Sequence, residues 1–159
     1  GITIGEESAS EETKLTATFN IVYQPGTLKA IGLQNGVAVD SVVLQTAGEP
    51  TKIRLTADRN ALHANADDLS YITAEIVDAH GHLVPDAMLP LEFSIKGAGE
   101  IIATANANPS DMESFQQPKH KTFRGKCLFI VRPKGSAGKI TVTASGKGLG
   151  SSQAVITTN

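Results

Sequence analysis

Four histidines are the residues of this sequence that could hold a metal ion. His80 and His82 are separated by one glycine, whereas His63 and His120 lie in other polar loops. Zinc sites use nitrogen and sulfur ligands at set spacings, such as two histidines four residues apart on a helix. No histidine pair has that spacing, and Cys127 is the only cysteine, which excludes a four-cysteine site. We predict surface turn histidines, no metal site and no cofactor.

Aspartates gather near the predicted strand ends of one segment, where oxygen-rich loops could bind calcium. They are Asp58, Asp67, Asp68, Asp78 and Asp86. The D-x-D-x-D-G pattern of a calcium loop is absent. Aspartates are also common in turns, because their carboxylates accept hydrogen bonds from nearby backbone amides. We predict this turn chemistry for them.

Glutamates could support hydrolysis of a glycosidic bond, which by the retaining mechanism needs two carboxyl groups about 5–5.5 Å apart. The candidates are Glu75, Glu92, Glu100 and Glu113. Strand alternation points the first two outward, and nothing in the sequence marks a cleft. The serine motif G-x-S-x-G is absent too, and the glycines of residues 146–150 suit a strand connector. We predict no catalytic residue in this chain.

Aromatic rings could stack on a sugar, and the candidates are Tyr23, Tyr71, Phe115 and Phe123. Tryptophan is absent and aromatic residues make up 4% of the chain. Because buried aromatic rings are also major contributors to a core, we favour core packing for these four. A carbohydrate platform is the alternative.

A long polar stretch, residues 106–121, is a candidate contact loop. Loops of more than about 12 residues are uncommon in compact domains and often make a functional contact. Its first ten residues contain two large apolar side chains, Met112 and Phe115, that belong to no predicted strand. Either these plug the end of the domain, or the loop docks another domain. The docking residues would be Asn106, Asn108, Pro109, Met112 and Phe115.

Period-two alternation of apolar and polar residues predicts three strands near the start of the chain. They are residues 14–23, 27–33 and 37–45. Asn35-Gly36 between the last two is a strong signal for a β-hairpin. A β-sandwich typically has about seven strands, so we predict that residues 1–46 are the C-terminal part of an incomplete immunoglobulin-like domain. Glycine and proline in residues 47–50 indicate a linker.

The remaining residues, 51–159, carry a regular series of strand patterns separated by turn signals. The predicted strands are residues 52–57, 69–77, 89–96, 100–105, 122–132, 139–145 and 152–157. The apolar spacing of an amphipathic helix is not sustained anywhere. We therefore predict an all-β chain with a complete immunoglobulin-like β-sandwich over residues 51–159.

Composition narrows the classes of partner. The net charge is −2 with no basic stripe, so nucleic acid is not an expected partner. The apolar runs are shorter than the roughly 20 residues of a membrane helix, so no membrane insertion is expected.

Several motifs carry a resemblance to known families. Residues 49–87, containing P-T-K-I-R-L-T-A-D-R, resemble the immunoglobulin-like modules of bacterial invasins and intimins. F-S-I-K-G-A-G-E-I (93–101), N-A-N-P-S-D-M-E-S-F (106–115) and F-R-G-K-C-L-F-I-V (123–131) resemble the C-terminal domain of glycoside hydrolase family 2 β-galactosidases. Residues 23–32 and 46–50 resemble the end of the preceding immunoglobulin-like domain of those enzymes.

The resemblance implies a parent enzyme that hydrolyses β-galactosides or related β-glycosides by the retaining mechanism. The catalytic glutamates of that family belong to an upstream barrel and match no position here. The chain would thus be a non-catalytic accessory region with a structural or domain-docking role. Its partners would be the upstream catalytic barrel and the other domains of the parent. The resemblance favours a periplasmic or secreted bacterial parent.

Two other functions stay open at this point. A cell-surface adhesin spacer of the invasin type rests on residues 49–87 alone, and a carbohydrate-binding module would require sugar affinity. The unpaired strands of residues 1–46 would leave an apolar face and a sheet edge in water. They are expected to pack on the rest of the chain or to form a homodimer.

Overall fold

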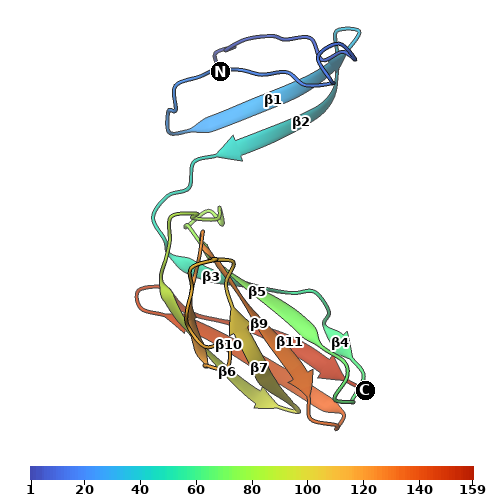
Figure 1. The fold of residues 1–159 in the computed structure, drawn as a ribbon, viewed down its shortest axis with the longest axis vertical. Coiled ribbons are helices and arrows are strands. Elements are labelled where there is room, and N and C mark those ends of the chain that lie inside the picture. Colours follow the sequence, from blue (N-terminus) through green and yellow to red (C-terminus); the bar gives the residue numbers. More distant parts are fainter. The chain divides into compact units, whose positions relative to one another are not determined.

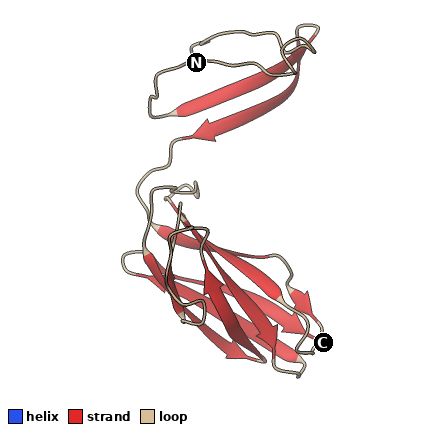
Figure 2. Cartoon of the chain, in the orientation of Figure 1, coloured by secondary structure: helices blue, strands red, loops and turns tan.

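The computed structural model describes all residues, 1–159, and contains strands but no helix. No segment is therefore a helix that could cross a membrane. The chain forms two compact units, Gly1–Thr46 and Ala47–Asn159, which are shown in Figures 1 and 2. The prediction of an all-β chain is confirmed.

The first unit contains one antiparallel hairpin of β1 (Thr27–Gln34) and β2 (Val37–Gln45). Asn35 (φ 51°) and Gly36 (φ 77°) both adopt positive φ at its turn, as a type I′ turn requires. The predicted hairpin is therefore present.

The strand predicted over residues 14–23 is not formed. Residues 11–15 make a turn in which Lys14 and Leu15 have positive φ, and residues 16–23 are unpaired. The alternation of apolar and polar residues indicates which side chains would share one face of a strand. A strand also needs a neighbouring strand for its backbone hydrogen bonds. β1 and β2 pair only with each other, so the first unit has two strands where three were expected.

The second unit is an immunoglobulin-like sandwich of two sheets. One sheet has the order β4-β11-β10-β6-β8 and the other the order β3-β5-β9-β7. Every pairing is antiparallel except that between β4 and β11. The strands are β3 (Lys52–Ala57), β4 (Ala61–Leu62), β5 (Ser70–Val77), β6 (Pro90–Gly97), β7 (Gly99–Ala105), β8 (Lys119–Lys121), β9 (Lys126–Pro133), β10 (Gly138–Gly146) and β11 (Gly150–Thr158).

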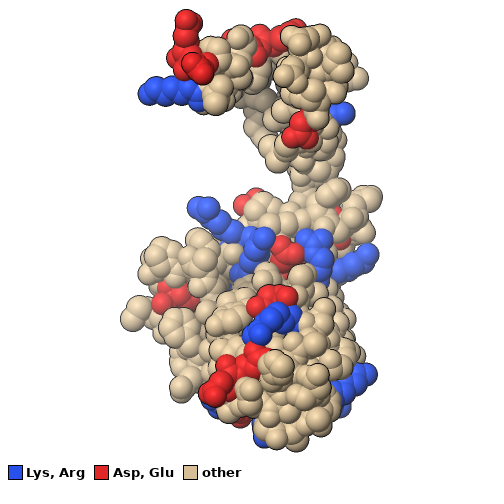
Figure 3. All heavy atoms as spheres, turned by 90° about the vertical axis from the view of Figure 1, so that its right-hand side faces the viewer, with Lys and Arg blue, Asp and Glu red and all other residues tan.

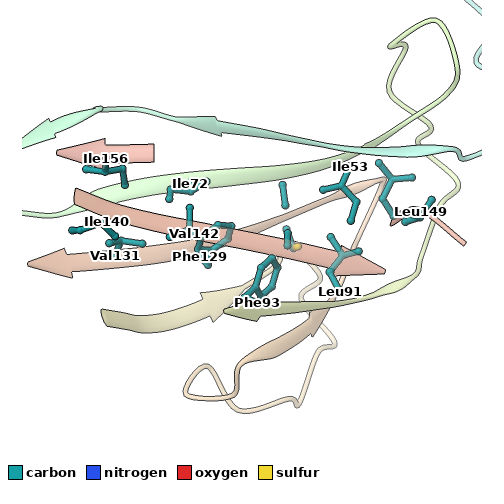
Figure 4. Packing of buried hydrophobic residues seen from close by; sticks show 14 of the residues in the cluster. Ile53, Ile72, Leu91, Phe93, Phe129, Val131, Ile140, Val142, Leu149 and Ile156 are labelled. Atoms are coloured by element: carbon teal, nitrogen blue, oxygen red, sulfur yellow. The ribbon is translucent and has the colours of Figure 1, made fainter. Parts of the chain in front are cut away.

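The hydrophobic core lies between the two sheets, and Figure 4 shows its side chains pointing toward one another. Phe129 of β9 is fully buried, and its ring centroid lies 4.5 Å from that of Phe93 on β6. Ile72 and Val142 come from opposite sheets and are also fully buried. Alternating strand residues supply this layer, as expected for two sheets packed face to face.

One predicted strand is divided in two. Residues 122–132 were expected to form a single strand, but the chain turns at Arg124 (φ 50°) and Gly125 (φ 75°). β8 ends at Lys121, and Phe123 pairs with Lys126 across the turn. A side chain at Gly125 would place Cβ 2.4 Å from the Val84 carbonyl oxygen, so packing as well as φ favours glycine there.

Candidate functional site

The loop between β7 and β8 is held by side chains that bond its own backbone. Asn106 Oδ1 accepts from Asn108 N at 2.8 Å, and Asn108 Oδ1 accepts from Ser110 N at 3.0 Å. Asp111 Oδ1 accepts from Glu113 N at 2.8 Å. Such Asx turns give a long loop a defined backbone conformation without the hydrogen bonds of strand pairing. Two of the predicted docking residues, Asn106 and Asn108, thus shape the loop.

A hydrogen bond between a buried histidine and an aspartate fixes the same loop to the sandwich. His120 is 1% exposed, and its Nε2 lies 3.1 Å from Asp111 Oδ2. Its Nδ1 lies 3.4 Å from Thr104 Oγ1, which donates to Gln117 O at 2.9 Å. Backbone donation from Glu113, followed by the Asn106 amide and the nearby His120 ring, lowers the pKa of the Asp111 carboxyl. The expectation that His120 is a surface histidine is therefore wrong.

The sequence contained a weak signal for the position of His120. In Lys119-His120-Lys121 the two lysines are exposed and the histidine is buried, which is the alternation of a strand with one buried face. Three residues are too few to establish a period. The pattern becomes interpretable only because Leu91 of β6 pairs with His120.

The apolar residues of the loop point into solvent. Met112 is 94% exposed and Phe115 is 60% exposed, and Pro109 is also exposed. The interpretation that Met112 and Phe115 plug the end of the sandwich is therefore wrong. Met112 lies near the tip of the loop, whereas Phe115 lies at its base, where its carbonyl accepts from Thr104 N at 2.7 Å.

A pocket of about 470 Å³ lies between the base of this loop and β7. Arg132 Nη2 donates to Glu100 Oε1 at 2.7 Å in its wall, and Nε donates to the same oxygen at 3.1 Å. The lining residues are Glu100, Ile101, Ile102, Ala103, Phe115, Gln116, Gln117, Pro118 and Arg132. Sequence reasoning identified Phe115 and Glu100 of this set but did not bring them together, because the Glu100–Arg132 pairing depends on the register of β7 on β9.

The turn after β5 is organised by one buried carboxylate. Asp78 accepts hydrogen bonds from the backbone amides of Gly48, His80 and His82, each at 2.9 Å. These bonds, that from Gly48 foremost, hold the pKa of Asp78 well below its usual range. His80 and His82 are exposed as expected. The predicted turn chemistry is confirmed for Asp78.

Two groups of side chains have ligand atoms close enough to share a metal ion. They are Asp78-His80-His82 and Asp111-Glu113-His120, each with its ligand atoms within 4.8 Å of one another. In both groups the aspartate oxygens already accept hydrogen bonds from amides or a histidine ring. Their geometry is that of folded turns.

The four glutamates considered for glycoside hydrolysis lie on four different elements. Glu75 of β5 pairs with Arg54 and Lys126, each at 2.8 Å. Glu92 is exposed on β6, in the opposite sheet. Glu100 pairs with Arg132, and Glu113 lies in the loop. Of the four, only Glu100 lines the pocket described above. Acidic and basic side chains are interspersed on the face of the second unit shown in Figure 3.

Family comparison agrees with this architecture. Residues 53–155 match the model of the glycoside hydrolase family 2 C-terminal domain 5, and residues 1–40 match a domain of unknown function, DUF4982. A β-galactosidase of Bacteroides ovatus is 40% identical over 135 residues, which are 85% of this chain and 16% of that protein. The chain thus spans about a sixth of that relative's length.

Solved structures give the same result. A glycosyl hydrolase family 2 member from Bacteroides cellulosilyticus matches with a TM-score of 0.93 and 39% identity, covering 98% of this chain and 20% of that one. A β-glycosidase from Bacteroides vulgatus matches with a TM-score of 0.81 and 31% identity, covering 85% of this chain and 18% of that one. The chain belongs to glycoside hydrolase family 2, in which residues 53–155 form the C-terminal domain 5.

Proposed function

We propose that this chain is a non-catalytic accessory region of a β-galactosidase-type glycoside hydrolase, where it docks other parts of the parent protein. The placement of its four candidate glutamates on four different elements supports a non-catalytic role. The small share of the relatives that it spans supports a larger parent that contains the catalytic carboxylates elsewhere. The substrate class of the parent, β-galactosides or related β-glycosides, follows from the relatives and belongs to the proposal.

The observation that carries the docking role is the uncovered apolar surface of the first unit. Fifteen large apolar side chains of residues 1–46 are exposed, compared with five in the rest of the chain. Burial of apolar area contributes about 25 cal/mol per Å², so this surface strongly favours a partner. Exposed apolar patches of this extent mark interaction sites.

The two faces of the hairpin differ in a way that identifies the docking face. On one face Leu28 pairs with Leu44, and Ala30 pairs with Val42. We call these four residues the apolar face. The opposite face mixes apolar and polar residues, as in the Thr27–Gln45 pair, whose side chains are hydrogen-bonded. Sheets with one buried face show this division into apolar and polar sides.

We propose that strands of the parent upstream of residue 1 cover the apolar face and complete an immunoglobulin-like domain. Residues 1–46 would then be the C-terminal part of that domain, residues 47–50 a linker and residues 51–159 the complete sandwich. The exposed apolar segment 19–23 would find its strand partner in the same domain. A homodimer through the apolar face is the alternative occupant, and it predicts a concentration-dependent mass.

The tip of the β7–β8 loop is a second docking contact in this proposal. Met112 is nearly fully exposed on a loop whose backbone is fixed by Asx turns and by the His120–Asp111 pair. A rigid loop with an exposed apolar tip loses little conformational entropy on binding. The partner would be the catalytic barrel or a neighbouring domain of the parent.

An activity assay tests the non-catalytic role. The purified chain should not hydrolyse a chromogenic β-galactoside, whereas a complete family 2 β-galactosidase serves as the positive control. Turnover by the purified chain that disappears in Glu100→Gln or Glu75→Gln would contradict the proposal. Turnover that survives every glutamate variant would identify a contaminating enzyme, and repurification should remove it.

A further inference from the structure

The pocket beside β7 has the dimensions of a small-ligand site. Its volume of about 470 Å³ falls within the roughly 300–1,000 Å³ of ligand pockets. Ile101, Ile102 and Ala103 of β7 form one wall, and residues 115–118 form the other. A bulge between Ile101 and Ala103 interrupts the pairing of β7 with β9 at this point, and bulges often re-aim side chains beside functional sites.

The loop wall of the pocket is fixed by backbone hydrogen bonds. Phe115 O accepts from Thr104 N at 2.7 Å, Gln117 O accepts from Thr104 Oγ1 at 2.9 Å, and Pro118 O accepts from Phe93 N at 2.7 Å. The chain is therefore anchored on both sides of Gln116. The Phe115 ring remains 60% exposed. An exposed ring on an anchored backbone is a preorganised stacking surface.

The polar groups of the pocket have unused hydrogen-bonding capacity. Arg132 directs both of its bonds to Glu100 Oε1, so Glu100 Oε2 and Arg132 Nη1 have no partner in the chain. The side-chain amides of Gln116 and Gln117 make no hydrogen bond either. Together these four side chains offer hydrogen-bond donors and acceptors in a pocket that the Phe115 ring also lines. The acid and the base offset each other's charge, which disfavours a strongly charged ligand.

A sugar ring matches this combination of groups. Its axial C–H face is apolar and packs on an aromatic ring, while its neighbouring hydroxyl groups both donate and accept. We propose that the pocket formed by Glu100, Arg132, Gln116, Gln117 and the Phe115 ring binds a neutral saccharide. The site does not depend on the docking role, since Met112 at the loop tip does not line the pocket.

The open pocket and its single ring favour a weak interaction, with a Kd on the order of 1 mM. The test is titration of the isotopically labelled chain with galactose and lactose, followed by amide chemical shifts to about 50 mM, well above that Kd. Saturable shifts should be confined to the amides of residues 100–103, 115–117 and 132. The absence of a saturable shift, or shifts spread over the whole surface, would overturn the proposal.

Three comparisons assign the binding to this pocket. Phe115→Ala should weaken the affinity at least tenfold, whereas Tyr71→Ala, which removes an exposed ring outside the pocket (41% exposed), should leave it unchanged. Retained spectral dispersion verifies that each variant is folded. Glucuronate should bind no more tightly than galactose, because the unpaired Glu100 Oε2 repels a carboxylate and offsets the attraction of the unpaired Arg132 Nη1. An equal loss of sugar affinity in Phe115→Ala and Tyr71→Ala, or tighter binding of glucuronate than of galactose, would contradict the neutral-saccharide site. This outcome is independent of the result of the activity assay.

Discussion

His120 Nε2 lies 3.1 Å from Asp111 Oδ2, and this contact joins a buried strand residue to the middle of the longest loop. Through it, a side chain that is 1% exposed fixes a loop whose tip is almost fully exposed. The pair thus gives the loop a single arrangement in which Met112 and Phe115 are both presented outward.

Removing the carboxylate should free the loop without unfolding the sandwich. In Asp111→Ala, His120 Nε2 loses its partner and Glu113 N loses its acceptor, so amide hydrogen exchange in residues 106–118 should accelerate at least tenfold. Exchange in β9 and β10 should change little. Asp67→Ala is the control, because the Asp67 carboxylate makes no hydrogen bond within the chain. Equal acceleration in both variants would contradict the anchoring role.

Asp78 should make the stability of the second unit fall at acid pH. Hydrogen bonds from Gly48, His82 and His80 lower the pKa of Asp78 below its usual 3.8. A depressed carboxyl pKa stabilises the folded state above the unfolded pKa, and this contribution is lost as pH falls toward the folded value. The free energy of unfolding should thus decrease below about pH 4.

Urea unfolding at a series of pH values measures this effect. Asp78→Asn should be less stable than the wild type at pH 7, and its stability should depend less on pH between about pH 5 and pH 2. The pKa values of Asp111 and Asp68 are also lowered. In Asp78→Asn these two carboxyls therefore leave a smaller dependence of the unfolding free energy on pH, with the same sign. An unchanged slope in Asp78→Asn would show that the carboxylate does not contribute.

Phe129 should be a principal contributor to the core. Phe129→Ala removes a fully buried ring that contacts Phe93, and such truncations cost about 3–5 kcal/mol. Phe115→Ala removes the same ring from an exposed position and should change the stability by less than about 0.5 kcal/mol. Denaturant titration of the two variants compares these positions directly. Similar losses of unfolding free energy in the two variants would indicate that Phe115 is part of the core and would contradict its exposed position in the loop.

Substitutions at Gly97 and Gly148 distinguish the stability cost of a steric clash from the cost of a strained backbone. Both have positive φ, but a Cβ at Gly97 would lie 1.9 Å from the Lys139 carbonyl oxygen, whereas Gly148 opens into free space. Gly148→Ala should cost about 1–2 kcal/mol from the left-handed backbone alone. Gly97→Ala should cost about 3 kcal/mol or more, because the β6–β10 pairing must also shift. Equal costs by urea unfolding would contradict the close approach of β10.

Local patterns in the sequence were sufficient for most of the fold. Alternation located the long strands of the second unit, and Asn35-Gly36 located the hairpin of the first. The turn at Arg124-Gly125 was missed because residues 122–132 contain the most apolar run of the chain, which predicts one central strand covered on both faces. The positive φ of two consecutive residues divides that segment, and the close approach of the Val84 carbonyl to Gly125 appears only in the folded chain.

The candidate site was less accessible to sequence reasoning because it depends on register. Glu100 and Arg132 are 32 residues apart and meet through the pairing of β7 with β9. Asp111 and His120 meet only once the loop has folded back on Thr104. The strand expected over residues 14–23 shows the opposite case, in which the alternation is present in the sequence but the segment pairs with no strand of the structure.

The docking face is tested most directly by two adjacent residues on opposite faces of one hairpin. Val42 belongs to the apolar face and Val43 to the mixed face, and they are 60% and 52% exposed. Binding of the fluorescent apolar probe ANS reports accessible apolar surface. In purified chain, Val42→Glu should reduce ANS binding severalfold, because it interrupts the Leu28–Ala30–Leu44 surface, whereas Val43→Glu should reduce it only slightly. Equal reduction by the two variants, or no change with Val42→Glu, would contradict the account that this face is built to receive the rest of the parent protein.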